Sequence, residues 1–248
     1  METELYDVIR ETEESHWWYV GRRRLVFDVL ARILPEYQRP RVLDIGCGTG
    51  FNLQTLRTLG VRDGIGLDIS SRALSHCRTR GIPLLVQGDF GRIPFRANTF
   101  DVVLALDVIE HIQDDRGALN GLIHLLRPGG RLILFTPAFS FLWSAQDRVS
   151  HHYRRYTAPE LRAKLDSAGY RIEKLSYANT MLFPMVWAGR MWLKASGQSE
   201  TVKDENHLHP AWSNGLLTGL FSMERPLLRR WNLPFGVSLL AVAARPRT

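Results

Sequence analysis

The chain has 248 residues, of which 45% are hydrophobic and 23% are charged, so it can bury one large core or two small ones. Its apolar runs are shorter than the ~18 residues that suggest a membrane span, and its acidic start lacks the pattern of a signal peptide, so we expect a cytoplasmic protein. Two cysteines without metal-finger spacing argue against a disulfide framework or a structural zinc, and the net charge of +7 favours anionic partners without making nucleic acid the expected one.

From residue 41 onward, short apolar runs alternate with helical stretches, which indicates a parallel sheet covered by helices on both faces. Pro128, Gly129 and Gly130 form a strong stop signal for the helix that precedes them. The predicted strands are residues 41–46, 61–68, 82–89, 100–107 and 131–137. The predicted helices are residues 49–59, the segment from Ser70 or Ser71 to Arg80, and residues 115–127.

The pattern changes after residue 137. The expected elements are a loop at 138–157, a helix at 158–167, a strand at 170–178, helical segments at 180–195 and 212–231 with a polar loop at 196–210 between them, and a last strand in FGVSLLAVAAR at 235–245. We therefore predict four parts, namely an N-terminal helical lid (1–35), a core (36–180), an aromatic-rich helical insertion (181–232) and the last strand of the core (233–248).

A glycine-rich loop follows the first predicted strand. VLDIGCGTG at 42–50 places an acid and three alternating glycines where this strand turns into the first helix. Glycines leave no Cβ between the backbone and a ligand, so the loop can press against a cofactor at the carboxyl edge of the sheet. Asp68 ends the second strand about twenty residues later, which suits a carboxylate that binds ribose hydroxyls. A nicotinamide dinucleotide fits less well, because its pattern needs a glycine where this chain has Phe51.

Four motifs resemble the successive motifs of class I S-adenosylmethionine-dependent methyltransferases: Asp44 to Gly50, GLDIS at 66–70, QGDF at 87–90 and LLRPGGRLILFTP at 125–137. The resemblance covers about residues 40–180. It implies a Rossmann-like, doubly wound α/β fold with a seven-stranded sheet and an antiparallel last strand. It also implies S-adenosylmethionine as the methyl donor and S-adenosylhomocysteine as the product.

The same resemblance assigns cofactor-binding roles to residues at the strand ends. Asp44 would face the cofactor's ammonium group, Asp68 the ribose, and Asp89 the adenine with Phe90 beside it. The full set of implied cofactor-binding residues is Asp44, Gly46, Cys47, Gly48, Gly50, Asp68, Ile69, Asp89, Phe90, Leu106 and Asp107.

ALDVIEHI at 105–112 follows the fourth strand. If the chain turns helical after Asp107, then Asp107, Glu110 and His111 share one face, and His111 could act as a general base near neutral pH. The stretch is similar to the metal-binding Glu-x-x-Glu-His of ubiquinone-biosynthesis O-methyltransferases, but it has Asp at position 107. Because class I members without a metal share this pattern, we expect no metal, with these three residues as the ligands if one binds. A supporting role for Glu110 and His111 is the alternative.

RVSHHYRRYT at 148–157 lies where the resemblance places part of the acceptor pocket. His151 and His152 are further candidate bases. Arginines can grip a carboxylate or phosphate bidentately, although here they could instead pair with acids such as Glu110 or Asp147 and fix the loop. The candidate acceptor-binding residues of this segment are Tyr153, Arg154, Arg155 and Tyr156.

SHWWYVGRRRLV at 15–26 precedes the first strand. The resemblance implies that the N-terminal helices fold over the carboxyl edge of the sheet as a lid, with Arg22 to Arg24 facing an anionic group. Alternatively, the aromatic residues only pack the helix onto the sheet and the arginines are solvated. The candidate acceptor-binding residues of this lid are His16, Trp17, Trp18 and Tyr19.

The aromatic insertion at 181–232 has several possible roles. It could belong to the core, roof an apolar acceptor tunnel, join copies of the chain, or contact a membrane peripherally with its basic residues on lipid phosphates. The oligomeric state is not readable from these residues.

These features predict a methyltransferase that acts on a small-molecule acceptor, at the oxygen of an apolar or ring-bearing compound with an anionic group. The alternatives are C- or N-methylation of a natural product or lipid-linked glycan precursor, RNA 2′-O-methylation, and a non-catalytic cofactor-binding partner protein. Base methylation of nucleic acid is not expected, because LDVIEH replaces the usual Asn/Asp-Pro-Pro-Tyr/Phe box after the fourth strand.

Overall fold

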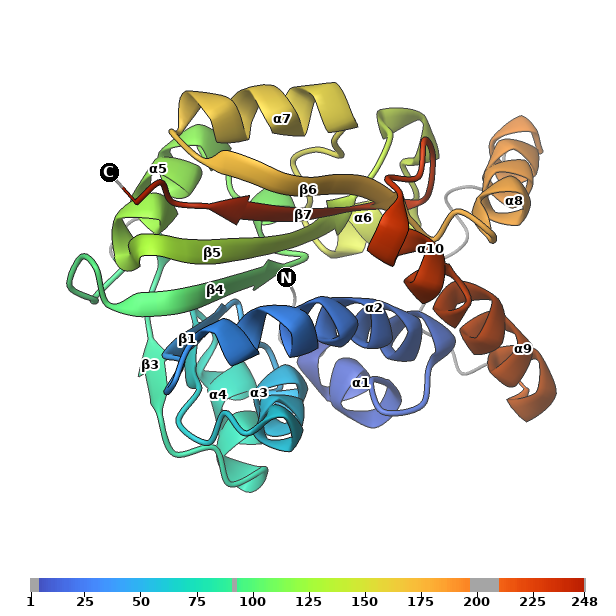
Figure 1. Ribbon diagram of the computed structural model, residues 1–248. Helices are drawn as coiled ribbons and strands as arrows, with labels where there is room; N and C mark the ends of the chain where they lie inside the picture. Colours follow the sequence, from blue (N-terminus) through green and yellow to red (C-terminus); the bar gives the residue numbers. More distant parts are fainter. Residues whose placement is uncertain (1–4, 91–92, 197–209, 248) are drawn as a thin grey trace.

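A computed structural model describes residues 5–90, 93–196 and 210–247 (Figure 1). Its centre is a seven-stranded sheet with the strand order β3-β2-β1-β4-β5-β7-β6. The strands are β1 (Val42–Ile45), β2 (Ile65–Asp68), β3 (Leu85–Gln87), β4 (Phe100–Leu106), β5 (Leu126–Pro137), β6 (Arg171–Ala178) and β7 (Ser238–Ala244). Because β7 runs antiparallel to both of its neighbours, the predicted α/β sheet with a reversed last strand is confirmed.

Helices cover both faces of this sheet. One buried cluster joins the sheet to α2, α3 and α4, and a second joins it to α5 and α7. The α-helices are α1 (Leu5–Thr12), α2 (Trp17–Ile33), α3 (Phe51–Leu56), α4 (Ser71–Thr79), α5 (Asp115–Leu125), α6 (Ala145–Val149), α7 (Ala158–Ser167), α8 (Phe183–Ala195), α9 (Ala211–Ser222) and α10 (Glu224–Arg230). The 3₁₀ helices are η1 (Leu34–Glu36), η2 (Arg57–Leu59), η4 (Ile109–His111) and η5 (Ser140–Leu142).

The stop signal at 128–130 does not separate helix and strand as the sequence predicts. α5 already ends at Leu125, and β5 begins at Leu126 rather than at residue 131. Gly130 makes this possible, because a Cβ there would lie only 2.9 Å from the carbonyl oxygen of Arg127. The pairing of β4 with β5 also shifts register between Phe100 and Val102. The glycine therefore lets two backbones approach closely inside the sheet.

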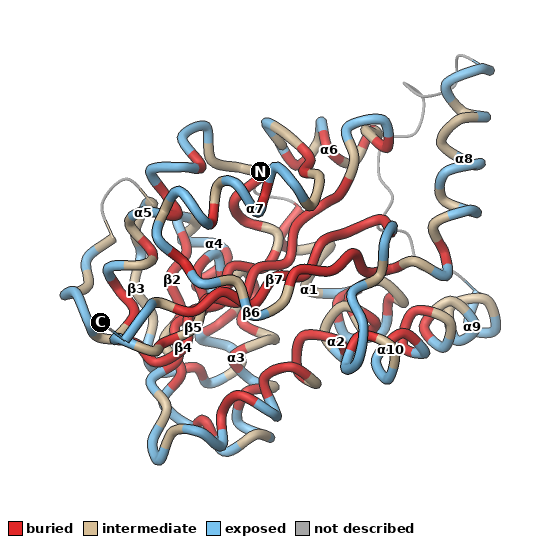
Figure 2. Tube along the Cα trace, turned by 45° about the horizontal axis from the view of Figure 1, so that its top comes forward, coloured by how far each residue is buried: buried red, intermediate tan, exposed pale blue. Residues whose placement is uncertain are grey.

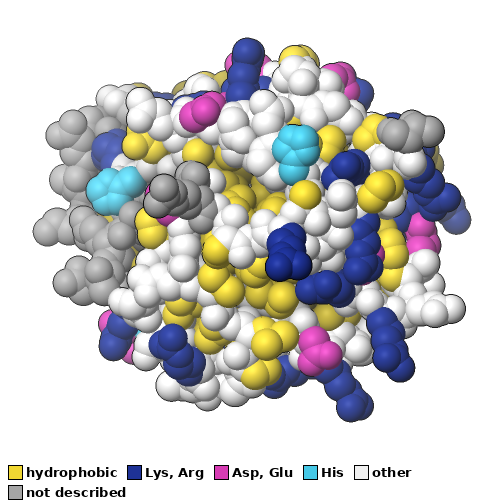
Figure 3. All heavy atoms as spheres, turned by 90° about the vertical axis from the view of Figure 1, so that its left-hand side faces the viewer, with side chains coloured by type: hydrophobic (Ala, Val, Ile, Leu, Met, Phe, Trp, Pro, Cys, Tyr) yellow, Lys and Arg dark blue, Asp and Glu magenta, His cyan; other side chains and the backbone are white. Residues whose placement is uncertain are grey.

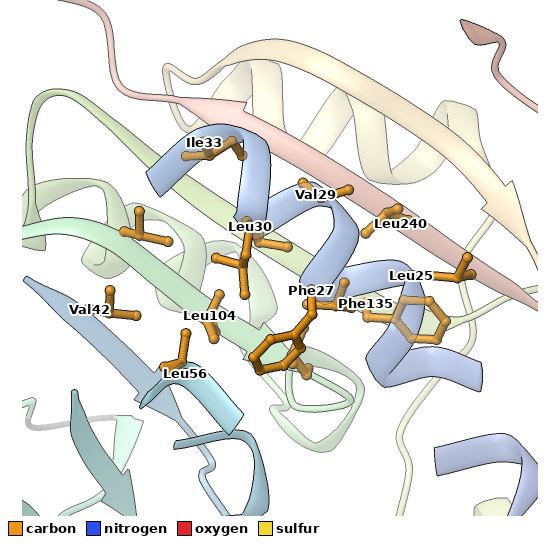
Figure 4. Close-up of a cluster of buried hydrophobic side chains, with 14 of the residues drawn as sticks. Leu25, Phe27, Val29, Leu30, Ile33, Val42, Leu56, Leu104, Phe135 and Leu240 are labelled. Atoms are coloured by element: carbon orange, nitrogen blue, oxygen red, sulfur yellow. The ribbon is translucent and has the colours of Figure 1, made fainter. Parts of the chain in front are cut away.

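α2 belongs to the core as well as to the predicted lid. Its second half carries buried side chains at helical spacing, among them Leu25, Leu30 and Ile33. Figure 4 shows these side chains lying over the sheet, near Leu104 of β4 and Leu240 of β7. The predicted boundary after residue 35 therefore does not separate a lid from a core, because one continuous helix contributes to both.

The later segments differ in part from the prediction. The expected loop at 138–157 contains η5 and α6, and the expected helical stretch at 212–231 is divided into α9 and α10. The predicted polar loop at 196–210 lies almost entirely outside the described residues. Figure 2 shows burial concentrated along the strands, whereas α8 has no buried residue. Of the helices described, none has both the length and the apolar character needed to cross a membrane.

Candidate active site

A cavity of about 1240 Å³ lies at the carboxyl edge of the parallel strands. Its wall includes the glycine loop after β1 and the ends of β2, β4 and β5, and α1, α2 and α8 contribute from outside the sheet. Parallel strands bring their carboxyl ends to one edge, which is where open α/β sheets bind ligands.

The glycine loop forms the floor of one half of this cavity. Gly46, Gly48 and Gly50 all have positive φ. A Cβ on Gly48 would meet nothing within 4 Å, and this glycine lines the cavity, so its backbone is open to a ligand. Cys77 donates from Sγ to the carbonyl oxygen of Gly48 at 3.2 Å, while its Sγ lies 3.9 Å from that of Cys47 with both thiols free.

Asp68 fixes the glycine loop from the end of β2. Its carboxylate accepts hydrogen bonds from the backbone N–H of Gly48 at 2.8 Å and of Ser70 at 2.9 Å. Tyr6 of α1 lies above it, with its hydroxyl 3.5 Å from Oδ1. Burial raises the pKa of Asp68, although the two backbone N–H groups act in the opposite direction. α1 therefore closes over the carboxylate that the sequence assigns to the ribose.

Asp44 is buried within β1 and keeps one oxygen without a partner. Its Oδ2 makes no hydrogen bond among the described residues. Burial raises the pKa of this carboxyl to about 7, although the charge of Arg22 acts against the rise. An unpartnered buried carboxylate oxygen suits a ligand that brings a positive charge, as the ammonium group of S-adenosylmethionine would. Asp44 thus has the free acceptor oxygen that the ammonium group needs, although its side chain does not itself line the cavity.

The structure places most, though not all, of the predicted cofactor residues on the cavity wall. Asp44 lies within its strand, and Gly50 begins the turn into α3, where a Cβ would lie 2.8 Å from the Sγ of Cys77, so neither lines the cavity. The residues that do line it are Gly46, Cys47, Gly48, Asp68, Ile69, Asp89, Phe90, Leu106 and Asp107.

An ion pair on the cavity wall joins α2 to the residue that follows β4. Arg22 binds Asp107 through Nη1, and its guanidinium lies 4.8 Å from the ring centre of Trp18. Asp107 itself has φ +56, so the chain does not continue as an α-helix there. Burial raises the pKa of Asp107 and the charge of Arg22 lowers it. Arg22 therefore meets an acid of the chain rather than an anionic ligand.

The two other arginines of the lid also have partners within the chain. Arg23 donates to the carbonyl oxygen of Glu13 at 3.1 Å and stacks over the ring of Phe51. Arg24 donates to the hydroxyl of Ser222 at 3.1 Å. The predicted grip of these arginines on an anion is therefore not supported.

Glu110 and His111 follow on η4 rather than on an α-helical face. Glu110 is fully buried and accepts a hydrogen bond from Thr136 at 3.1 Å, and burial raises the pKa of its carboxyl well above the usual value. Burial, with the nearby charge of His152, lowers the pKa of His111 to about 3. His111 is therefore a weaker base than the sequence predicts. The metal-ligating atoms that come together, within 4.8 Å of one another, belong to Glu110, His111 and His152, so Asp107 drops out of the predicted set.

His152 is held by an acid that the sequence named only as a possible partner of arginine. Its Nδ1 lies 2.8 Å from Oδ1 of Asp147. Arg155 donates to the same carboxylate from Nε and Nη2, each at 2.8 Å. Burial tends to raise the pKa of Asp147, but His152 and Arg155 outweigh it and hold the pKa far below its usual range. With Nδ1 on the carboxylate, Nε2 of His152 is the nitrogen left for another partner.

Three predicted residues of the same segment do not line the cavity. Tyr156 is buried and donates its hydroxyl to Asp115 at 2.8 Å, and Arg154 pairs with the same carboxylate at 2.9 Å. His151 is exposed, with φ +56. Their places are set by the fold of the loop, so a catalytic role for His151 and acceptor contacts for Arg154 and Tyr156 are not supported. Tyr153 and Arg155 do line the cavity.

The lid and α8 close the acceptor half. His16, Trp17, Trp18 and Tyr19 line the cavity as predicted, and His16 also caps α2 by accepting from the N–H of Trp18. From α8 come Met185, Val186, Gly189, Arg190 and Leu193, which lie three or four positions apart on one helical face. Of the predicted insertion, the inner face of α8 therefore lines the cavity.

Several residues of the site were not found from the sequence. Tyr6, Glu13 and Asn179 line the cavity, and Glu13 bonds to Thr49 of the glycine loop. None belongs to a motif, and each is brought to the site by contacts between distant segments. The spacing of the apolar residues in α8 was the only available signal for its inner face.

Comparison with known proteins identifies a domain and a fold that this chain shares with methyltransferases. A family model described as a methyltransferase domain matches residues 43–134. A chain in the solved complex of the Haloferax volcanii Trm112 methyltransferase activator and a methyltransferase superposes with a TM-score of 0.63 at 19% identity, covering 97% of both chains. At that identity the likeness shows the fold alone, which is the Rossmann-like methyltransferase fold.

Two curated relatives carry the comparison further. A probable S-adenosylmethionine-dependent methyltransferase of Mycolicibacterium smegmatis is 30% identical over 164 residues, which are 65% of this chain and 62% of that protein. A ubiquinone biosynthesis O-methyltransferase of Xanthomonas axonopodis is 29% identical over 189 residues, covering 65% of this chain and 78% of that protein. The chain thus spans less than two thirds of the mycobacterial relative. Residues 43–134 therefore match a methyltransferase domain, and over 65% of its length the chain is similar to S-adenosylmethionine-dependent methyltransferases.

Proposed function

We propose that the protein transfers a methyl group from S-adenosylmethionine to an oxygen of an apolar, ring-bearing small molecule. The observation that carries this proposal is the His152–Asp147 pair in the acceptor half of the cavity. An acceptor hydroxyl must lose its proton during methylation, and an imidazole oriented by a carboxylate can take it. A thioether or a tertiary amine carries no proton on its acceptor atom and would not need such a base.

S-adenosylmethionine supplies a methyl group on a positively charged sulfur, which makes that carbon electrophilic. The chain's part is to hold the acceptor in line and to receive its proton. Positioning of this kind is worth up to roughly 7–11 kcal/mol in well-oriented reactions. We assign His152 Nε2 as the proton acceptor, Asp147 as the group that fixes its ring, and Gly48, Asp68, Asp89 and Phe90 to the cofactor.

The nature of the acceptor follows from what lines the second half of the cavity. Trp17, Trp18, Val186 and Leu193 present apolar surface there. The arginines that reach the same space are occupied within the chain, since Arg22 pairs with Asp107. We therefore propose a neutral apolar acceptor, in place of the anionic one that the sequence favoured.

We expect methyl transfer without a divalent metal. Glu110 is buried and bonded to Thr136, and burial raises its pKa, which disfavours the charged carboxylate that a cation would need. His111 and His152 alone leave the cluster short of an anionic donor. Dialysis against a chelator followed by an activity assay tests this expectation.

Labelling with a cell extract tests the proposed reaction. The protein is titrated with S-adenosylhomocysteine in a calorimeter and then incubated with methyl-labelled S-adenosylmethionine and extract. We expect binding and a labelled small molecule, whereas label in RNA or no label at all would favour RNA 2′-O-methylation or a non-catalytic partner protein. Absence of binding would refute the methyltransferase proposal.

A pair of histidine variants tests the assignment of the base. His152→Asn should bind S-adenosylhomocysteine as the wild type does but lower kcat by about 100-fold or more. His151→Asn is the matched control, because His151 lies outside the cavity in the same loop. Equal rates for His152→Asn and the wild type would favour C- or N-methylation, in which no hydroxyl proton has to be removed.

We also propose that α8, α9 and α10 contact an anionic membrane, from which an apolar acceptor could reach the roof formed by α8. Four tryptophans of this region are exposed, and its basic residues outnumber its acids.

A further inference from the structure

Asn179 is a buried amide on the cavity wall that the chain itself leaves unsatisfied. Its side chain is fully buried, yet neither Nδ2 nor Oδ1 has a hydrogen-bond partner among the described residues. It lines the cavity directly after β6, beside Val237 and Ser238 at the start of β7. An unpaired buried polar group is unfavourable, so such a side chain calls for a partner from outside the chain.

The position of Asn179 places it in the acceptor half. The cofactor motifs lie at the ends of β1 and β2, whereas β6 is at the opposite edge of the sheet, beyond β5 and β7. Between them on the wall stand Asp107 of β4 and Pro137 of β5. A ligand group that reaches Asn179 therefore belongs to the acceptor rather than to the nucleoside of the cofactor.

The backbone of Asn179 is fixed in an unusual conformation. Its φ is +59, in the left-handed region that asparagine tolerates better than most residues. The turn is held from α10 by Glu224, a fully buried carboxyl group that accepts from the N–H of Met181 at 2.8 Å, with the N–H groups of Asn179 and Thr180 nearby. Close packing continues at Gly236, where a Cβ would lie 2.3 Å from the carbonyl oxygen of Ala178. The hydrogen bond to Glu224 and this close packing thus fix the backbone that carries the Asn179 amide.

Taking the proposed function as its basis, we propose that Asn179 is the polar recognition point for the acceptor and that Glu224 positions it. A carboxamide offers two donors and one acceptor side by side, so it matches a neutral group that both donates and accepts, such as a hydroxyl or an amide. A carboxylate or phosphate would leave Oδ1 facing a second acceptor. Asn179 thus selects acceptors that carry a hydroxyl or amide some distance from the methylated oxygen.

Fragment binding tests this proposal separately from catalysis. Benzamide, phenol, benzoate and toluene are titrated into the protein saturated with S-adenosylhomocysteine, with NMR of the ¹⁵N-labelled side-chain amides as the readout. The Asn179 amide signal, assigned by its loss in Asn179→Gly, should shift with benzamide and phenol and stay in place with benzoate and toluene. Glycine keeps the positive φ, so this variant removes the amide without straining the turn.

The expected effect of Asn179→Gly is a loss of about tenfold in benzamide affinity, with unchanged affinity for S-adenosylhomocysteine. Asn98→Gly is the matched control, since Asn98 also has a positive φ of 57 and does not line the cavity. Equal binding of benzoate, failure of benzamide and phenol to shift the Asn179 signal, or unchanged benzamide binding by Asn179→Gly would overturn the proposal. If S-adenosylhomocysteine itself failed to bind, the proposed function would fail instead.

Glu224 is tested by rescue. Glu224→Leu should lose benzamide binding, because the turn is no longer held, whereas Glu224→Gln should keep it, because the amide oxygen can still accept from the N–H of Met181. Both variants should retain affinity for S-adenosylhomocysteine. Loss of benzamide binding in Glu224→Gln, or its retention in Glu224→Leu, would contradict the positioning role.

Discussion

Two buried carboxyls of the site have opposite pKa shifts because of their partners. Asp147 is surrounded by His152 and Arg155, which hold its pKa far below the usual range despite burial. Asp44 is also buried, but it keeps an unpartnered oxygen, and burial raises its pKa to about 7. The first carboxylate is satisfied by the chain, whereas ionisation of the second is costly near neutral pH and would be favoured by an added cation.

Replacing Asp44 should therefore separate stability from binding. A carboxyl with a folded pKa near 7 and an unfolded pKa near 4 stabilises the free protein below about pH 4, and this stability is lost as the pH rises to about 7, up to roughly 4 kcal/mol. Asp44→Asn removes that loss, so without cofactor its Tm at pH 8 should exceed that of the wild type. Its affinity for S-adenosylhomocysteine should fall by about tenfold or more.

Thermal unfolding between pH 4 and pH 8, followed by calorimetry at pH 8, checks both parts. The exposed Asp166→Asn in α7 controls for the loss of one negative charge. If the Tm of Asp44→Asn and the Tm of the wild type change with pH in the same way, the pKa of Asp44 is not raised in the folded protein.

At the residue scale, motif spacing found most of the cavity wall formed by the ends of β1 and β2 and less of the wall formed by other elements. Gly48 and Asp68 were found because a glycine loop and a strand-end acid have a sequence signature. Asn179 and Tyr6 have none, because their places depend on how β6 and α1 pack against distant segments. Arg154 and Tyr156 were predicted to bind the acceptor because of their side-chain chemistry alone. In the structure both side chains bind the carboxylate of Asp115 instead.

At the scale of elements, α2 connects the site to the core and to α9. Its first turn is fastened by Asn214 of α9, which accepts from the N–H of Trp17 at 2.8 Å and donates to the carbonyl oxygen of Ser15 at 2.7 Å. Farther along α2, Gly21 lies against the buried ring of Phe221. The aromatic insertion is therefore part of the packing that places the lid.

Gly21→Ala should destabilise the protein through this contact. The added Cβ would lie 2.2 Å from Cδ1 of Phe221, and overpacking of this kind costs about 1–3 kcal/mol. Gly219→Ala in α9 is the control, because a Cβ there meets nothing within 4 Å and alanine favours the helix by up to ~1 kcal/mol. Urea denaturation of both variants measures the difference. Equal stability of Gly21→Ala and the wild type would mean that α2 and α9 pack less closely than described.

The alternating strands and helices of the core were predictable, because burial imposes period 2 or near-continuous apolar runs on strands and period 3.6 on helices. The start of β5 was not predictable, since Pro128 and Gly129 are turn residues that here lie inside a strand at a register shift. α6 was missed for another reason. It has only five residues, and its capping box of Ser144 and Asp147 is visible only once the hydrogen bonds are known.

At the scale of the whole molecule, basic charge is spread widely and exposed tryptophan is not. The face turned away from α8 and α9 carries a central hydrophobic patch with Lys and Arg side chains around it (Figure 3). The exposed tryptophans lie only in or beside α8, α9 and α10 among the residues described, at 46% for Trp187, 64% for Trp192, 76% for Trp212 and 58% for Trp231. The exposed tryptophans, rather than the basic residues, therefore distinguish the side of the molecule formed by α8, α9 and α10.

The exposed side chains of this region have the composition of an interfacial membrane surface. Trp212 and Leu216 on α9 and Met223 directly after it are exposed at helical spacing and form an apolar stripe. In α8, α9 and α10 the only acid is Glu224, which is buried, while Lys194, Arg225, Arg229 and Arg230 are exposed. Tryptophan prefers the bilayer interface, and basic residues are attracted to anionic headgroups. The exposed tryptophans and the exposed basic residues therefore both favour an anionic membrane as the partner of this surface.

Sedimentation with vesicles tests this surface. The protein should pellet with vesicles that contain phosphatidylglycerol and remain in solution with phosphatidylcholine alone, and added salt should weaken the binding. The double variant Trp192→Ala/Trp212→Ala should lower the partition coefficient by about tenfold or more, because each buried aromatic side chain contributes roughly 1.5–3 kcal/mol. Leu84→Ala, an exposed apolar residue outside this surface, should leave it unchanged. If the wild type stays in the supernatant with anionic vesicles and forms dimers that the double variant lacks, the exposed tryptophans join two copies of the chain and the membrane proposal is wrong.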